Sequence, residues 1–261
     1  MRDTGAVSPS EIHRRLISWA IATVAAIATG CGGAGAGVGD DSAPDAGAAD
    51  AMATFPPAPS PLPSSFPPEN VLADDMIFGG EAISTAQVQD FLTIKGSFLA
   101  TYTTGGRTGA QLIVELARDH GVNPLYMLAR IQTESSLIQS GTDADLASAT
   151  GCGCPDGGGC DPSLSGFASQ VDCAALTMQQ YAEELDTDGV TRAGWRVDVA
   201  HATLDPCSVA PANRATAALY TYTPWVGAYS TGCGDAGAGG STLVAFIYYR
   251  YWDAYPWGTD P

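Results

Sequence analysis

One glutamate of this 261-residue chain, Glu134, stands within an apolar helical pattern. Met127, Ile131, Glu134 and Ile138 follow one another at intervals of four, three and four residues. In a helix, this spacing places the carboxyl group on the same face as three apolar side chains. Burial raises the pKa of a carboxyl group because the charged form loses its hydration. We therefore expect Glu134 to stay protonated near neutral pH and to act as a general acid.

The helix that carries Glu134 has a clear start in the sequence. Asn123 is a suitable N-cap and Pro124 a suitable first residue, and the helix is expected to run to about Ile138. Arg130 lies one turn before Glu134, so the two side chains can also form an ion pair along the helix. A structural ion pair is thus the alternative interpretation of Glu134.

Other segments predict a mainly α domain around this helix. Two capping boxes, Ser84 to Gln87 and Thr108 to Gln111, each predict the start of a helix. Three more helices are expected, and a short strand is possible between glycine-rich loops. Their approximate ranges are 173–185, 213–223 and 241–252 for the helices, and 195–199 for the strand.

Three segments resemble a known family in the right order. Residues 124–138, in which a Glu-Ser pair closes the helix, look like the catalytic helix of lysozyme-like lytic transglycosylases and related glucosaminidases. Residues 148–151 together with 166–170 resemble the family's Gly-Leu-Met-Gln loop, although Gly-Phe-Ala-Ser-Gln is one residue longer. Residues 213–224 resemble its third motif, an Asn followed by Leu-Tyr and a turn. The resemblance covers about residues 80–230.

This resemblance implies a lysozyme-like α+β fold, in which a helical domain has a small loop- and strand-rich lobe beside a cleft. It implies cleavage of the β-1,4 bond between N-acetylmuramic acid and N-acetylglucosamine in peptidoglycan, with Glu134 as the one catalytic residue. Glu134 would protonate the leaving oxygen and later take the proton of the C6 hydroxyl group, giving a 1,6-anhydro end. The substrate-binding residues would be Ser135, Gln170, Tyr220 and Tyr222.

Two alternatives keep the same scaffold. A hydrolytic muramidase or glucosaminidase normally needs a second carboxylate, for which Asp143 and Asp145 are candidates beyond the helix. A non-catalytic peptidoglycan-binding lipoprotein would bind the wall without turnover. None of these functions needs a cofactor or a metal ion.

Seven cysteines include one, Cys31, near the N-terminus. The other six predict up to three disulfides in an exported protein, with fifteen possible pairings. The first four of them leave a structural zinc site as an alternative. The segment 152–160 is foreign to the common members of the family, and we interpret it as a disulfide-pinned loop on the rim of the cleft. The six cysteines are Cys152, Cys154, Cys160, Cys173, Cys207 and Cys233.

The N-terminus carries an export signal over residues 1–30. Arg14 and Arg15 precede an apolar run that is too short for a stable transmembrane helix. The run ends in small residues followed by Cys31, which resembles the bacterial lipobox, whose cysteine is lipidated. Ordinary cleavage after Ala28 is the alternative.

The rest of the chain divides into a tether and a folded domain. Residues 31–73 are rich in Gly, Ala and Pro and predict a disordered tether, and residues 74–261 predict the lysozyme-like domain. We expect a monomer, lipid-anchored to a bacterial membrane on its periplasmic or outer side. Its partners would be peptidoglycan strands and the membrane that holds the anchor. The net charge of −17 and the lack of a basic cluster exclude a stable nucleic-acid partner.

Overall fold

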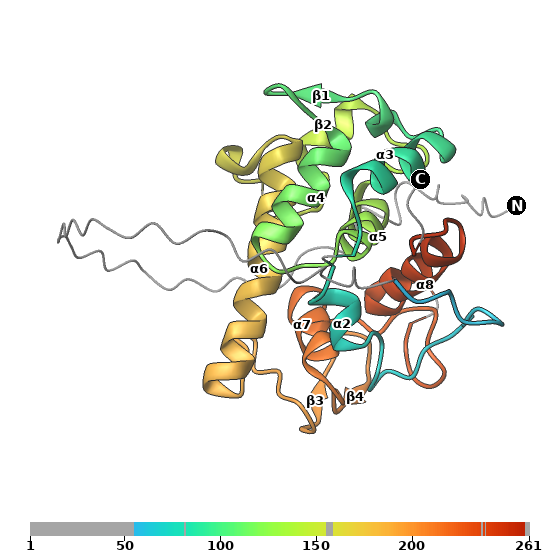
Figure 1. The fold of residues 1–261 in the computed structure, drawn as a ribbon. Helices are drawn as coiled ribbons and strands as arrows, with labels where there is room; N and C mark the ends of the chain where they lie inside the picture. Colours follow the sequence, from blue (N-terminus) through green and yellow to red (C-terminus); the bar gives the residue numbers. More distant parts are fainter. Residues whose placement is uncertain (1–54, 81, 155–158, 236, 238, 259–261) are drawn as a thin grey trace, which may run out of the picture.

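The computed structural model describes residues 55–80, 82–154, 159–235, 237 and 239–258. The predicted signal peptide, Cys31 and residues 32–54 lie outside the described residues. The described chain is mainly helical with two small antiparallel sheets, which confirms the predicted fold class (Figure 1). Within it, no helix combines the length and the apolar character needed to cross a membrane.

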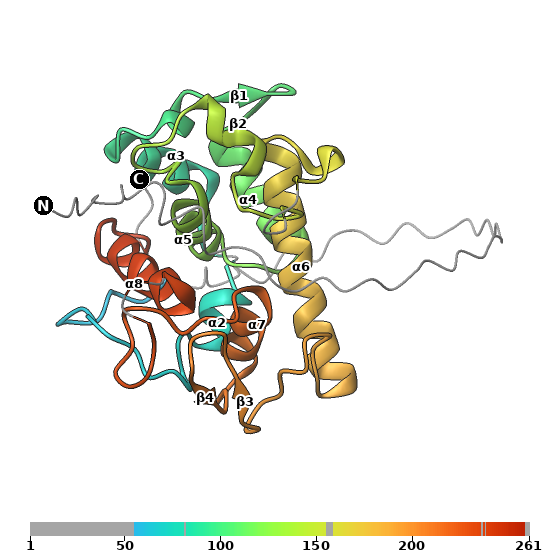
Figure 2. The same ribbon diagram turned by 180° about the vertical axis from the view of Figure 1, so that it is seen from behind.

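Helix α5 (Pro124–Ser135) lies in the middle of the molecule, between two groups of elements (Figures 1 and 2). The Asn123 side chain accepts the backbone N–H of Leu125, and Pro124 occupies the first turn, as predicted. The helix ends earlier than expected because Ser136 adopts a left-handed conformation, with φ of 60°. Helix α8 (Gly240–Asp253) makes the most extensive packing against α5.

The first group of elements, at the top of Figure 1, follows the predicted helix signals closely. Helices α3 (Thr85–Ile94) and α4 (Gly109–Asp119) both begin at the expected capping boxes, and both boxes are fully formed. Strand β1 (Thr103–Thr104) pairs antiparallel with β2 (Arg107–Thr108) just before α4. The short 3₁₀ helix η1 (Phe98–Ala100) connects α3 to this hairpin.

The second group, at the bottom of Figure 1, contains α2 (Asp74–Ile77), α7 (Arg214–Tyr222) and a second sheet. Strand β3 (His201–Ala202) pairs antiparallel with β4 (Ser208–Val209). The predicted strand over 195–199 is wrong. The Trp195 side chain is buried, whereas the residues after it form turns and irregular backbone and pair with no strand among the described residues.

Helix α6 (Phe167–Asp188) runs along one edge of both groups, as both views show (Figures 1 and 2). It begins six residues before the predicted start at 173. Gly166 and Gly189, which cap its two ends, both have positive φ values that suit glycine. Two short 3₁₀ helices precede it, η2 (Asp143–Ser148) and η3 (Pro162–Leu164).

Three disulfides join the six predicted cysteines: Cys152–Cys173, Cys154–Cys160 and Cys207–Cys233. The first ties the chain after η2 to α6, and the second closes the foreign loop on itself, although residues 155–158 of that loop lie outside the described residues. The zinc alternative is wrong, because all four of its cysteines are oxidised in pairs. The bonds fit an exported protein.

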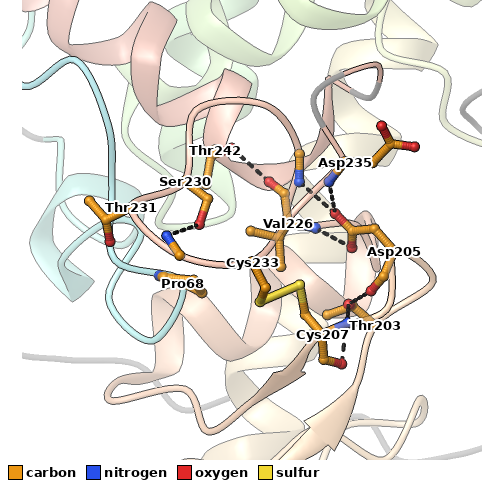
Figure 3. Close-up of a disulfide and its surroundings, with 12 residues drawn as sticks. Pro68, Thr203, Asp205, Cys207, Val226, Ser230, Thr231, Cys233, Asp235 and Thr242 are labelled. Atoms are coloured by element: carbon orange, nitrogen blue, oxygen red, sulfur yellow. Dashed lines mark hydrogen bonds between the residues drawn. A yellow bond between two sulfur atoms is a disulfide. The ribbon is translucent and has the colours of Figure 1, made fainter.

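A buried carboxylate supports the third disulfide (Figure 3). Asp205 is 1% exposed, and its two oxygens accept the backbone N–H groups of Val226, Gly227 and Asp235 at 2.8, 2.9 and 3.1 Å. Asp205 and the Cys207–Cys233 disulfide therefore fix the same two segments to each other, one after β3 and one after α7.

The folded domain begins earlier than predicted. Phe66, Val71 and Leu72 are each at most 3% exposed, and the N–H of Phe66 bonds to Tyr229 O at 2.8 Å. The described residues 55–73 therefore belong to the domain, and the prediction of a tether up to residue 73 is wrong for them. The prediction relied on proline content, whereas the Phe66 ring stacks on Tyr249 of α8 and the carbonyl group of Pro68 accepts a hydrogen bond from Tyr220 of α7.

Candidate functional site

Glu134 lies in the last turn of α5 and forms an ion pair with Arg130. Arg130 Nη1 donates to Glu134 Oε1 at 2.7 Å, and the two side chains are 1% and 4% exposed. A charge-assisted hydrogen bond of this kind is strong, and it matters more in a buried place, where water cannot replace either partner. The structure thus contains the ion pair that the sequence offered as an alternative to catalysis.

Arg130 has further partners on two elements. Nη1 also donates to Thr223 Oγ1 at 3.2 Å, Nη2 donates to Tyr126 Oη at 3.3 Å, and the guanidinium group lies 4.1 Å from the ring centre of Tyr222. Burial by itself would lower the pKa of Arg130, but Tyr126, Glu134 and Tyr222 outweigh it and raise the pKa above its ordinary value. Arg130 is therefore a permanent buried cation beside Glu134.

Three of the four predicted substrate-binding residues meet at one loop, residues 149–152. Ser135 Oγ lies 2.8 Å from Ala149 O and 2.9 Å from Ile131 O, so its hydroxyl group can donate to the loop or to its own helix. Tyr222 Oη donates to Thr150 O at 3.1 Å. The ends of α5 and α7 are thereby joined through the loop beside Glu134.

Gln170 holds the same loop from α6. Its Oε1 accepts the N–H of Thr150 at 3.2 Å, and its Nε2 donates to Cys152 O at 2.7 Å and to Leu164 O at 2.9 Å. Gln170 is fully buried, so the expectation that it touches substrate is wrong. Its carboxamide group instead satisfies the backbone of a turn that has no sheet or helix to pair with.

Tyr220 does not reach the site at all. It is fully buried, its hydroxyl group donates to Pro68 O at 2.9 Å, and its ring stacks on Trp195 at 4.8 Å. The prediction of substrate binding by Tyr220 is therefore wrong. Residues two apart in a helix point in different directions, so only one of the two tyrosines could face Glu134. Tyr222, which remains partly exposed, is that one.

Both candidates for a second carboxylate lie on the 3₁₀ helix η2. Asp143 is exposed on η2. Asp145 uses Oδ2 to accept the N–H of Thr142 at 2.9 Å and so caps the same turn. The structure accounts for Asp145 as a cap.

A cavity of about 300 Å³ lies between α5 and α8, next to this site. Thr133, the residue before Glu134, lines it together with Ser136, while Phe246 and Arg250 lie on the α8 side. Glu134 itself does not line it. A larger cavity of about 710 Å³ lies on another part of the molecule, between Phe55, Phe78 and Arg118.

Sequence reasoning missed three partners in this site, Tyr126, Thr150 and Thr223. One partner could have been found from the spacing. Tyr126, Arg130 and Glu134 occur every four residues in an otherwise apolar helix, and this spacing predicts a polar network along one face of it. Thr150 accepts and donates bonds to Tyr222 and Gln170, but nothing in its residue type or spacing distinguishes it from other loop threonines.

A scan of protein-family models, a search of curated proteins and a search of solved structures each find no match to this chain. The residues of the site are accordingly the basis of any functional assignment.

Proposed function

We propose that this protein cleaves the β-1,4 glycosidic bond of peptidoglycan strands as a lytic transglycosylase, with Glu134 as the single catalytic residue. The observation that supports it is the meeting of separate segments at one place. The Glu134-Ser135 end of α5, the loop 149–152 and Tyr222 of α7, which resemble the family's motifs in sequence, are joined by hydrogen bonds in space.

In this reaction Glu134 first donates its proton to the glycosidic oxygen, and the bond from that oxygen to the anomeric carbon breaks. The N-acetyl group of the substrate stabilises the positive charge that develops at this carbon. Glu134, now a carboxylate, then takes the proton of the C6 hydroxyl group, whose oxygen bonds to the anomeric carbon. A single carboxyl group therefore serves as acid and then as base.

Arg130 has a defined part in this scheme. A cation 2.7 Å from Glu134 opposes the protonated form that the first step needs. Because Arg130 also donates to Thr223 and Tyr126, it keeps two partners when the carboxyl group turns toward a bound strand. Arg130 would then stabilise the carboxylate that remains after proton transfer.

The same ion pair favours a second candidate, a peptidoglycan-binding protein without catalytic activity. The side chain of Glu134 is only 4% exposed, and a pair that is buried this well can be purely structural. In that case the surface around Ser135 and Tyr222 would hold the wall without cutting it.

The three disulfides fit an exported protein. We propose that Cys31 carries a lipid that anchors the protein to a bacterial membrane, on the periplasmic side or at the cell surface. The anchored domain would reach the wall as a monomer.

The proposal is tested by incubating the full chain with isolated peptidoglycan sacculi and measuring the soluble fragments released. We expect release by the wild type, loss of at least about a thousandfold in Glu134→Gln, and unchanged release by Glu115→Gln. Glu115 is the matched control because it is an exposed glutamate on α4, paired with Arg107 at the surface. Binding to sacculi without release by the wild type would instead establish the non-catalytic protein.

A further inference from the structure

The cavity between α5 and α8 has an unusual charge for this protein. Its α5 side carries amide and hydroxyl groups, from Gln132, Thr133 and Ser136, and its α8 side carries Phe246 and Arg250. No carboxylate lines it among the described residues, although acidic residues outnumber basic ones by 28 to 11 in the whole chain. Its volume of about 300 Å³ lies at the lower end of the range of small-molecule sites.

Arg250 makes no ion pair with the described residues. Its Nη1 donates to Pro63 O at 3.3 Å and to Phe246 O at 3.2 Å, and its guanidinium group stacks 3.2 Å from the ring centre of Phe246. These contacts hold the side chain in place but leave its positive charge without an acidic partner. A guanidinium group fixed in this way is ready to bind a carboxylate.

Among the described residues that line the cavity, Arg250 is the one charged side chain. The cavity is therefore basic in a chain of net charge −17. An anionic group is the ligand that gains most from this arrangement.

We infer that this cavity binds a carboxylate of the short peptide attached to the glycan strand. Arg250 receives the carboxylate, while Gln132 and Thr133 can exchange hydrogen bonds with the peptide's amide groups. Thr133 and Ser136, which line the cavity, flank Glu134 at the C-terminal end of α5, so we place the peptide and the sugar that carries it at the same end of this helix. The inference rests on the proposed function for the identity of the ligand, and it makes the protein selective for strands that carry peptides.

Binding of soluble ligands to the full chain tests this without turnover, for example by calorimetry. The first ligand is the disaccharide of N-acetylglucosamine and N-acetylmuramic acid with a tetrapeptide that ends in a free carboxylate. The second is the same disaccharide without the peptide, with the lactyl carboxyl group of its muramic acid amidated so that it carries no carboxylate. In both, C1 of N-acetylglucosamine is joined to N-acetylmuramic acid, so neither contains the bond from C1 of N-acetylmuramic acid that the proposed reaction cuts. We expect the wild type to bind the peptide-bearing ligand about tenfold more tightly, as one charge-assisted contact would give.

Three variants separate the charge of Arg250 from its structural contacts. Arg250→Gln should lose the preference for the peptide, Arg250→Lys should keep most of it, and Arg196→Gln should bind like the wild type. Arg196 is the control because it is exposed and lies in the turn after α6. The inference is overturned if Arg250→Gln keeps the preference, if it weakens both ligands equally, or if Arg250→Lys behaves like Arg250→Gln.

This result is independent of the proposed enzymatic activity. If Arg250→Gln loses the preference and the wild type releases nothing from sacculi, the peptide site is supported and the enzymatic activity is contradicted. Release from sacculi without any preference for the peptide would keep the enzyme and reject the site.

Discussion

At the scale of single residues, the buried pair of Arg130 and Glu134 determines how the site is interpreted. Each side chain alone would be costly to bury, and each is tolerated because the other is 2.7 Å away. The sequence contained both members, and it predicted correctly that their spacing permits a pair. It could not decide whether Glu134 is a member of a structural ion pair or a general acid, because Arg130 is held by Tyr222 and Thr223 at the end of α7, more than ninety residues later in the chain.

Removing one member of this pair should cost much stability. We predict that Arg130→Met lowers the free energy of unfolding in urea by about 3–5 kcal/mol, because Glu134 keeps its burial but loses its cation. The double variant Arg130→Met, Glu134→Gln should recover a large part of that loss. A single variant within about 1 kcal/mol of the wild type would show that the pair is not important for the fold.

Asp205 is the second residue whose role depends on burial. We predict that Asp205→Ala lowers the free energy of unfolding by about 3 kcal/mol or more, because three backbone N–H groups lose their acceptor (Figure 3). Asp253→Ala, at the exposed end of α8, is the control and should change it by less than about 0.5 kcal/mol. Equal effects of the two substitutions in chemical unfolding would contradict the role given to Asp205.

At the scale of elements, the local sequence predicted where helices start better than it predicted which residues contact each other in the folded domain. The boxes at Ser84 and Thr108 formed as expected because capping depends on neighbours three residues apart. The start of α6 was missed because residues 166–170 resembled a loop motif, yet Gly166 caps a helix there. The roles of Gln170 and Tyr220 were missed because their partners, Thr150 and Pro68, are distant in sequence.

The contact between α4 and α6 should depend on pH through His120. Its ring nitrogens lie 2.9 Å from Asp172 Oδ1 and 2.8 Å from Gln179 Oε1. Burial alone would lower the pKa of His120, but these two bonds and the charges of Asp172 and Asp119 outweigh it and raise the pKa above 6.5. Because the pKa of His120 is higher in the folded state than in the unfolded state, its protonation stabilises the fold. This contribution is fully present when the pH is below the pKa of the unfolded state, and it is lost as the pH rises through the pKa of the folded state.

We therefore predict that the stability difference between the wild type and His120→Gln is largest at about pH 6 and shrinks toward about pH 8. Denaturant unfolding across this range measures it. His201→Gln serves as the control, since His201 bonds to the carbonyl group of Ala202 and not to a carboxylate. A difference that grows with pH would contradict the prediction.

At the scale of the whole molecule, residues 55–73 form a strap across the helical domain. Trp252 Nε1 donates to Pro56 O at 2.8 Å, and Phe66 stacks on Tyr249 at 5.5 Å between ring centres. The composition of this segment predicted a spacer. Composition cannot show which of its few apolar side chains pack against the rest of the domain. The strap brings the start of the domain onto α8, beside the cavity that contains Arg250.

Deleting the strap should expose part of the core. We predict that a chain lacking residues 1–73 unfolds with a free energy several kcal/mol below that of a chain lacking residues 1–54, because burial of Phe66, Val71 and Leu72 is lost at about 1.5–3 kcal/mol each. Thermal and urea unfolding of both chains measure the difference. Equal stabilities would show that the strap is a spacer after all.

The chemistry of the cut ends tests the central claim most directly. Fragments released from sacculi by the full chain would be identified by mass spectrometry, for the wild type and for Glu134→Gln. We predict 1,6-anhydromuramic ends from the wild type and no fragments from the variant. Reducing ends from the wild type, or anhydro ends from Glu134→Gln, would contradict a transglycosylase in which Glu134 is the single acid and base.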